Sequence, residues 1–188
     1  GFDELIPWDG NVYTARASFD APLSEDTNLT SGYSFAGDDG SDTFLHALDF
    51  AFIHRWPGTY RKLRWQNELF YRDTRVSPFV HEEEHEHEEE HEHEHHLHVG
   101  TRDANDWGGY SLLQLTLDKY WETGVRFDWW DAEHYGDEWG VTTFLTYFFS
   151  HSMYLRPAYR YNKFEDGSDE HLALVQFVWG LGPHAHRL

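Results

Sequence analysis

Strict alternation of apolar and polar residues constrains the fold of this chain more than any other feature. It is clearest over residues 60–73, where large apolar side chains have one parity and charged or amide side chains have the other. Successive side chains of a β-strand point to opposite faces, whereas helical spacing would scatter both sets around a cylinder. Residues 121–131 and 152–163 repeat the pattern. These three segments therefore predict strands with one apolar face and one polar face.

Weaker alternation in six further segments brings the predicted number of strands to nine. The connections alternate between tight turns and longer stretches rich in Asp and Gly, which is typical of outer-membrane barrels. The six segments are residues 11–21, 27–36, 43–56, 110–119, 139–149 and 170–181. The tight turns fall at residues 23–26, 56–59, 119–120 and 150–151, and the longer connections at 37–42, 74–109, 131–138 and 164–169.

The composition favours a lipid environment for these strands. Aromatic residues make up 18% of the chain, yet the mean hydropathy is -0.74 and the formal net charge is -20. A β-barrel in lipid combines these properties, because it has an apolar belt, aromatic girdles, a polar interior and polar loops. No apolar run of about 18 residues predicts a membrane-spanning helix. The absence of cysteine excludes disulfides and thiolate metal sites, and the negative charge argues against nucleic acid or anionic headgroups as partners.

We therefore expect an all-β fold: an antiparallel meandering transmembrane β-barrel or its C-terminal portion, with long loops on one rim and short turns on the other. The chain is then a single domain over residues 1–188, with its longest loop at residues 74–109. A β-sandwich or a lipocalin-like cup is the alternative. Antiparallel bacterial barrels have even strand numbers, so nine strands predict either a missed strand within residues 2–8 or a larger barrel. We favour the larger barrel, which also explains why no signal peptide opens the chain.

Residues 81–98, HEEEHEHEEEHEHEHHLH, contain only histidine, glutamate and one leucine. Neutral imidazole is a good ligand for zinc, copper and nickel, with carboxylate as an auxiliary ligand. Histidines two apart share one side of an extended chain and histidines four apart share one side of a helix, so the tract can chelate in either conformation. It is also the composition of a solvated, disordered charge run, and the two interpretations are compatible. The candidate metal ligands are His81, His85, His87, His91, His93, His95, His96 and His98.

Two other histidines, His46 and His54, share the parity of their apolar neighbours. Polar groups on the lipid face of a barrel are tolerated near its rims. We therefore expect these two histidines near the two membrane interfaces rather than in a metal site.

The polar parity collects charged residues that we expect to face the barrel interior. The simpler interpretation is a ladder of cross-strand ion pairs, since each arginine has a carboxylate nearby in strand order. The alternative is a pore lining with a mild excess of positive charge that favours small anions. The candidate lining residues are Lys62, Arg64, Glu68, Arg72, Glu122, Arg126, Asp128, Arg156 and Arg160, and the same parity includes Arg16, Asp20, Asp49 and Arg55.

Catalysis has little support in the sequence. No nucleophile elbow or glycine-rich phosphate loop is present. The string from His81 to His85 matches the zinc-protease pattern HExxH, but a repetitive His/Glu tract gives such a match by chance, and no amphipathic helix surrounds it. We expect no enzyme activity and no obligatory cofactor.

The C-terminal segment LALVQFVWGLG at residues 172–182, followed by PHAHRL, resembles the ending of a family of porin-like Gram-negative outer-membrane barrels. Some members of this family are associated with zinc and with TonB-dependent receptors. Residues 44–50 (FLHALDF) and 65–72 (WQNELFYR) are similar to strands of the same family. The resemblance implies a bacterial outer-membrane location, with the last strand running inward and the tract at residues 81–98 outside the cell. No plug domain or TonB-interacting segment is visible, so the resemblance does not extend to active transport.

These patterns together predict an outer-membrane, porin-like transport protein whose external loop captures a divalent transition metal, zinc first and copper or nickel next. One alternative is a metal-binding surface or storage module on a structural barrel, and another is a plain diffusion porin with an incidental tract. The expected partners are outer-membrane lipid and divalent metal ions, together with a second copy of the chain or a periplasmic protein.

Overall fold

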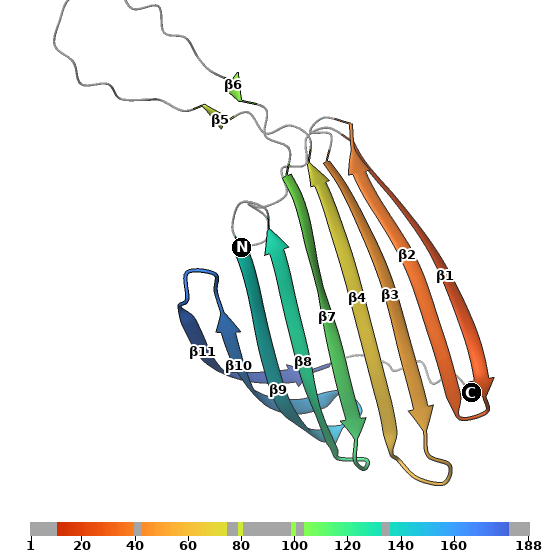
Figure 1. Ribbon diagram of the computed structural model, residues 1–188. Helices are drawn as coiled ribbons and strands as arrows, with labels where there is room; N and C mark the ends of the chain where they lie inside the picture. The colour runs from red at the N-terminus through yellow and green to blue at the C-terminus, as the bar shows by residue number, and fades with distance from the viewer. Residues whose placement is uncertain are drawn as a thin grey trace, which may run out of the picture.

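The computed structural model describes residues 11–39, 43–74, 79–80, 99–100, 104–132 and 136–180, which form strands and their connections without a helix. Nine strands form one sheet in the order β1-β2-β3-β4-β7-β8-β9-β10-β11, and β5 and β6 form a separate two-stranded ladder (Figure 1). The strands are β1 Val12–Ser24, β2 Thr27–Asp38, β3 Thr43–Arg55, β4 Lys62–Thr74, β5 Phe79–Val80, β6 Val99–Gly100, β7 Ala104–Thr116, β8 Trp121–Ala132, β9 Gly136–Ser150, β10 Met153–Lys163 and β11 Asp169–Trp179. The predicted all-β antiparallel meander is confirmed.

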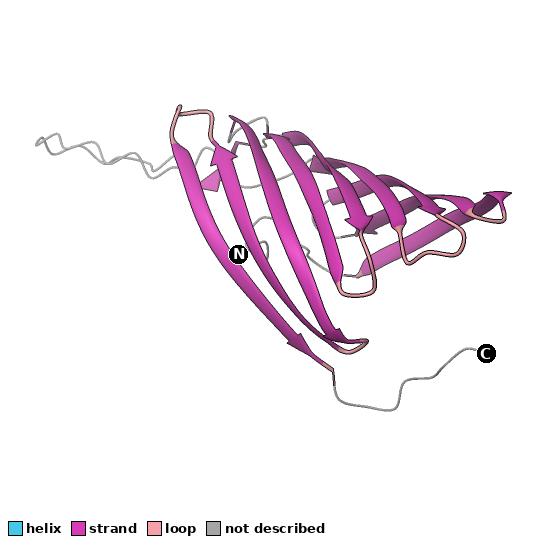
Figure 2. Ribbon diagram, turned by 90° about the horizontal axis from the view of Figure 1, so that it is seen from below, coloured by secondary structure: helices cyan, strands magenta, loops and turns pink. Residues whose placement is uncertain are grey.

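The nine-stranded sheet is strongly curved and open (Figure 2). Its edges are β1 and β11, which do not pair with each other in the described part of the chain. Every neighbouring pair in the sheet is antiparallel. With an odd number of strands, β1 and β11 therefore run in the same direction. Of the two forms that we expected, a closed barrel or its C-terminal portion, the described residues do not form the closed barrel.

Period-two alternation gives this sheet two chemically different faces. The apolar face is the one that carries Leu48 of β3 and its cross-strand partner Leu69 of β4. The polar face is the opposite one, where Asp49 lies beside Glu68. Large apolar side chains on the apolar face remain exposed, whereas several polar side chains on the polar face are buried. Side chains converge on the concave side of a curved sheet and splay apart on the convex side, so we assign the polar face to the concave side.

The first residues of β7 correct one prediction. The sequence led us to expect a loop over residues 74–109, but residues 104–109 pair with β4 and residues 106–109 also pair with β8. Gly108 and Gly109 look like loop residues by composition, yet each has a tryptophan of β8 as its cross-strand partner. A Cβ atom added at either glycine would overlap with the ring of that tryptophan, Trp130 or Trp129 respectively. Glycine is therefore required here because aromatic rings lie over the backbone of the neighbouring strand.

The prediction of long connections along one rim is also wrong in part. The links from β2 to β3, from β8 to β9 and from β10 to β11 are short, and only the link from β4 to β7 is long. Aspartates suggested a loop over residues 131–138, but Asp131 and Asp137 are cross-strand partners at the end of the β8–β9 ladder. Acidic residues at the end of a strand remain accessible to water, as they do in a loop. An acidic composition therefore does not distinguish a strand end from a loop.

Candidate functional site

The polar face is the candidate site, because the cross-strand register brings the predicted lining residues together there. One row across the sheet contains Asp49, Glu68, Tyr110 and Asp128, and every residue of matching parity lies on the same face. The register places all nine candidate lining residues on this face, together with Arg16, Asp20, Asp49 and Arg55.

Sequence reasoning missed several acidic residues of this face, and the most deeply buried of them is Asp106. It was assigned to a loop, although its parity matches that of Tyr110. In the structure Asp106 is only 2% exposed and accepts a hydrogen bond from Nε of Arg72 at 2.6 Å. The two side chains also form an ion pair. The continuation of the alternation through Trp107 was the signal that could have identified this partner.

A second ion pair crosses an intervening strand. The Nη2 atom of Arg16 on β1 lies 2.8 Å from Oδ2 of Asp49 on β3. Between them on β2 is Gly32, whose added Cβ atom would lie 2.6 Å from the Arg16 guanidinium and 2.7 Å from the Asp49 carboxylate. The absence of a side chain at Gly32 therefore creates the space in which this pair forms.

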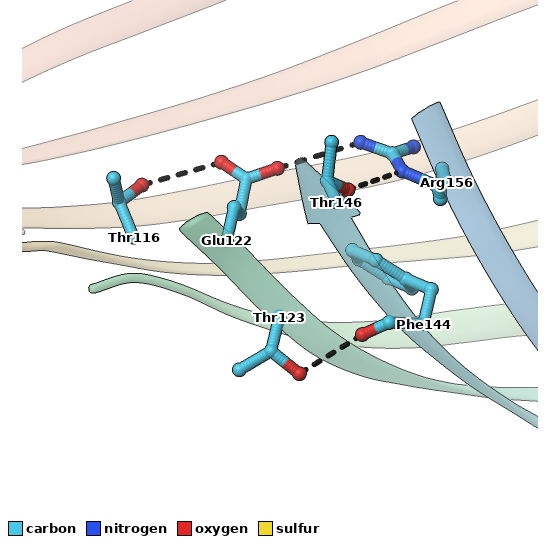
Figure 3. Close-up of polar contacts among 6 residues, drawn as sticks. All are labelled: Thr116, Glu122, Thr123, Phe144, Thr146 and Arg156. Atoms are coloured by element: carbon cyan, nitrogen blue, oxygen red, sulfur yellow. Dashed lines mark hydrogen bonds and ion pairs between the residues drawn. The ribbon is translucent and has the colours of Figure 1, made fainter. Parts of the chain in front are cut away.

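The most extensively bonded cation of the polar face is Arg156 on β10 (Figure 3). Its Nε donates to Oγ1 of Thr146 at 2.7 Å, and its Nη2 lies 3.4 Å from Oε1 of Glu122. Thr116 donates to the other oxygen of Glu122 at 3.2 Å. The Arg156 guanidinium also lies over the ring of Phe144, 4.6 Å from its centroid. Thr146 is fully buried and Glu122 nearly so, so this network braces four strands of the sheet, β7 to β10.

Arg126 and Arg160 complete the set of bonded cations. Nη2 of Arg126 lies 2.6 Å from Oδ1 of Asp128, and the guanidinium lies 4.0 Å from the ring centroid of Tyr110. Nε of Arg160 donates at 2.7 Å to Asn162, which in turn donates at 2.7 Å to Glu170. The ion pair of Arg126 and the hydrogen bond of Arg160 lie within their own strands, and of these polar contacts only the hydrogen bond from Asn162 to Glu170 joins two strands.

These ion pairs do not extend to the last residue of β3 and the first residues of β4. Among the described residues, Arg55, Lys62 and Arg64 make no ion pair, and no hydrogen bond forms from their side chains. The premise that each arginine has a nearby carboxylate is therefore wrong for this group. Strand order alone does not show that Arg64 lacks a carboxylate partner. The cross-strand register does, because the neighbours of Arg64 in the adjacent strands are uncharged.

The apolar face carries three histidines, and each is hydrogen-bonded through Nδ1 to a hydroxyl of a neighbouring strand. His46 lies 2.7 Å from the Tyr33 hydroxyl, and His54 lies 2.9 Å from Oγ1 of Thr27. His171 has the same relation to the Tyr159 hydroxyl, at 2.5 Å. His46 and His54 lie near opposite ends of β3, as their parity and position predicted.

The predicted metal ligands, from His81 to His98, lie outside the described residues. Within the described residues, no group of three or more His, Cys, Asp or Glu side chains could hold a metal ion. The same part of the chain has no helix that is long and apolar enough to cross a membrane.

Three groups at the strand ends and turns have shifted pKa values. Hydrogen bonds from the backbone and the side chain of Asn11 lower the pKa of Asp39. Hydrogen bonds from the side chain and the backbone of Ser168 lower the pKa of Asp166. A hydrogen bond with Tyr120 raises the pKa of Lys119. All three shifts favour the charged form, so these groups keep their charge over a wider pH range at the rims of the sheet.

Neither the family models, nor the curated proteins, nor the solved structures contain a match to this chain. The resemblance of residues 172–182 to the porin-like family stays a prediction.

Proposed function

We propose that this chain forms part of the wall of a transmembrane β-barrel in a Gram-negative outer membrane. The observation that carries the proposal is the apolar face. Water-soluble proteins seldom expose contiguous apolar patches beyond a few hundred Å². On this face, Asp, Glu, Lys and Arg in the described strands occur only within the first two or the last two positions of a strand. They are Asp73, Asp131, Asp137, Lys163 and Asp169.

The strand lengths fit this environment. The nine strands contain between 11 and 15 residues, and a tilted transmembrane strand needs about 9–11. Four tryptophans of the apolar face lie toward the strand ends, with Trp107 and Trp139 near one rim and Trp121 and Trp179 near the other. Such girdles are typical of strands that cross two membrane interfaces.

Closure of the barrel requires more strands than the described sheet contains. Because β1 and β11 run in the same direction, direct pairing between them would be parallel. An antiparallel seam on both edges requires an odd number of further strands between β11 and β1. This count supports our preference for a larger barrel of which the sheet is one portion.

Fluorescence quenching by brominated lipids tests the placement of the apolar face. Single-tryptophan variants of the full chain in vesicles would retain either Trp65, on the apolar face, or Trp130, on the polar face. We expect strong quenching of Trp65 and weak quenching of Trp130. Equal quenching of the two residues would show that lipid does not cover the apolar face.

The function proposed for this barrel is porin-like transport with metal capture by residues 81–98. Support comes from the polar concave face and from the density of histidine and glutamate in that tract. Single-channel conductance with and without zinc separates the alternatives. Conductance that responds to zinc supports the proposal, conductance that ignores zinc indicates a plain diffusion porin, and tight zinc binding without conductance indicates a surface or storage module.

The tract itself is proposed to bind several metal ions weakly rather than one ion tightly. An interleaved His/Glu repeat offers many equivalent ligand sets, whereas a single tight site needs ligands oriented by surrounding groups. Any one His→Ala change should therefore alter the affinity little, and replacement of all eight histidines should abolish binding. Affinity should also decrease below about pH 6.5, where imidazole becomes protonated. Calorimetry that finds one stoichiometric site, lost with a single His→Ala change, would refute this mechanism.

A further inference from the structure

Three cations form a compact group on the polar face at the end of β3 and the start of β4. Arg55 and Lys62 are direct cross-strand partners, and Arg64 is the next residue of β4 on the same face. They lie at the rim where β3 turns into β4, away from the connection between β4 and β7. We call this group the Arg55–Lys62–Arg64 cluster.

No carboxylate borders Arg64 on this face. Its uncharged neighbours are Ala51 and Ile53 of β3, Gln66 of β4, and Leu112, Gln114 and Thr116 of β7. Its remaining neighbours are the two other cations of the cluster. Three uncompensated positive charges therefore face one region of the concave surface.

The acidic residues closest in register have other positions or partners. Asp26, in the turn opposite Arg55, contacts it through a backbone hydrogen bond of 2.8 Å from Arg55 N to Asp26 O, without an ion pair between the side chains. Glu122 lies two strands from Lys62 and is bonded to Arg156 and Thr116. Glu68 lies farther along β4, beside Asp49 and Tyr110.

The cluster differs sharply from the other cations of the same face. Arg16, Arg72, Arg126 and Arg156 each have a carboxylate partner. In contrast, the Nε atom of Arg64 is shielded from solvent and has no hydrogen-bond partner among the described residues. Like charges directly opposite each other destabilise a sheet, and a buried donor without an acceptor does so as well. Both penalties are relieved if an anion with several acceptor oxygens lies over the cluster.

We propose that the Arg55–Lys62–Arg64 cluster binds a phosphate-bearing anion at this mouth of the concave face. Each guanidinium offers five N–H donors in a planar fork and the ammonium offers three. Guanidinium forks match the oxygen pairs of phosphate in a bidentate manner, and a dianion compensates two of the three positive charges. The assignment does not depend on the tract at residues 81–98 or on conductance. Free phosphate and a lipid phosphate headgroup present the same chemistry, and the experiment separates them.

The test uses the full chain folded in maltoside micelles, which contain no phosphate. Calorimetric titration with inorganic phosphate is compared with sodium chloride at matched ionic strength. We expect saturable binding of phosphate to the unsubstituted chain and at least about tenfold weaker binding for Lys62→Gln and for Arg64→Gln. Arg64→Lys keeps the charge but loses the planar fork, so its affinity for phosphate should lie between that of the unsubstituted chain and that of Arg64→Gln. Lys119→Gln removes a positive charge from the same rim outside the cluster and should leave the affinity unchanged.

A stability measurement distinguishes a binding role from a structural one. Without phosphate, Arg64→Gln removes mutual repulsion and should unfold at the same or a higher urea concentration than the unsubstituted chain. With phosphate, the unsubstituted chain should gain stability and the variant should not. A clear loss of stability in the variant without phosphate would overturn the proposal, as would phosphate binding no stronger than that of chloride. If Lys119→Gln weakened phosphate binding as much as Lys62→Gln and Arg64→Gln, the proposal would also be overturned, because binding would then follow the overall charge of the chain.

Vesicles identify the source of the phosphate group. Binding of inorganic phosphate that persists in phospholipid vesicles identifies a free anion as the ligand. Binding that occurs in maltoside micelles, but is abolished by phospholipid vesicles, identifies the lipid headgroup as the occupant of the same cluster.

Discussion

An arginine in the middle of the apolar face should cost far more in lipid than in water. Leu48 is the sixth of the thirteen residues of β3, and it is 56% exposed. At about 3.3 Å per residue it lies roughly 17 Å along the strand from the nearer end. If the sheet spans the membrane, Leu48→Arg places a charge near the midplane and lowers the free energy of unfolding by about 2–4 kcal/mol. In water the same change at so exposed a position should stay within about 0.5 kcal/mol.

Leu117→Arg is the matched control for this substitution. Leu117 is also a leucine, is 42% exposed, and follows the last residue of β7 at one rim. Near an interface, arginine on the lipid face costs about 0–1 kcal/mol. Reversible urea unfolding of the full chain from vesicles, followed by tryptophan fluorescence, measures both variants. Equal costs for Leu48→Arg and Leu117→Arg would refute the claim that the middle of this face contacts hydrocarbon.

Three further changes test contacts within the sheet. Gly109→Ala should lower the free energy of unfolding by about 1–3 kcal/mol, because the new methyl group meets neighbouring backbone. Gly32→Ala should lower it less, because its methyl group meets only the flexible ends of side chains. Urea unfolding of the two variants measures the difference. Glu122→Gln should lower the free energy of unfolding by about 1–3 kcal/mol. The loss should be smaller than for a fully buried ion pair, because the Arg156 side chain is 27% exposed. An unchanged urea midpoint would show that the Glu122–Arg156 pair does not brace the sheet. Asn11→Pro removes both the backbone and the side-chain donor to Asp39, so the pKa of that carboxyl should rise toward its ordinary value of 3.8, and Asn11→Ala should raise it less. Because the pKa of Asp39 is lower in the folded state, its contribution to stability is present above pH 3.8 and is lost as the pH falls through the folded pKa. NMR titration of the Asp39 carboxyl carbon measures that pKa in each variant.

The sequence was sufficient to predict the strands and the two faces because both depend on local periodicity. The predicted segments at residues 60–73, 121–131 and 152–163 match β4, β8 and β10 within two residues at each end. In these strands one face excludes charge except at the strand ends, so a shift by one residue would turn every side chain to the wrong side. A pattern under that constraint can be recognised without knowledge of the neighbouring strands.

Composition was a weaker guide where glycine and aspartate occur inside a strand. The pair Gly108 and Gly109 suggested a loop, but their conformation is determined by Trp130 and Trp129 on the next strand. A glycine that accommodates an aromatic ring cannot be distinguished by composition from a glycine in a turn. Only the register, which depends on both strands, separates the two.

The partners of Arg16 and Arg156 could not be predicted, because they depend on rows that cross the sheet rather than on order along the chain. Arg16 reaches Asp49 across β2 only because Gly32 lies between them, and Glu122 reaches Arg156 across β9 above the small side chain of Thr146.

The two unpaired edges of the sheet also bear on the membrane proposal. Hydrocarbon contains no water to satisfy backbone N–H and C=O groups, and each unpaired group there costs several kcal/mol. The outward edges of β1 and β11 are unpaired in the described sheet, while the apolar face beside them excludes charge except at the strand ends. An open edge is therefore incompatible with the lipid environment proposed for this face. If lipid covers the apolar face, both edges must pair with further strands, and the shared direction of β1 and β11 makes their number odd for an antiparallel wall. The proposed membrane insertion therefore implies completion of the barrel by further strands.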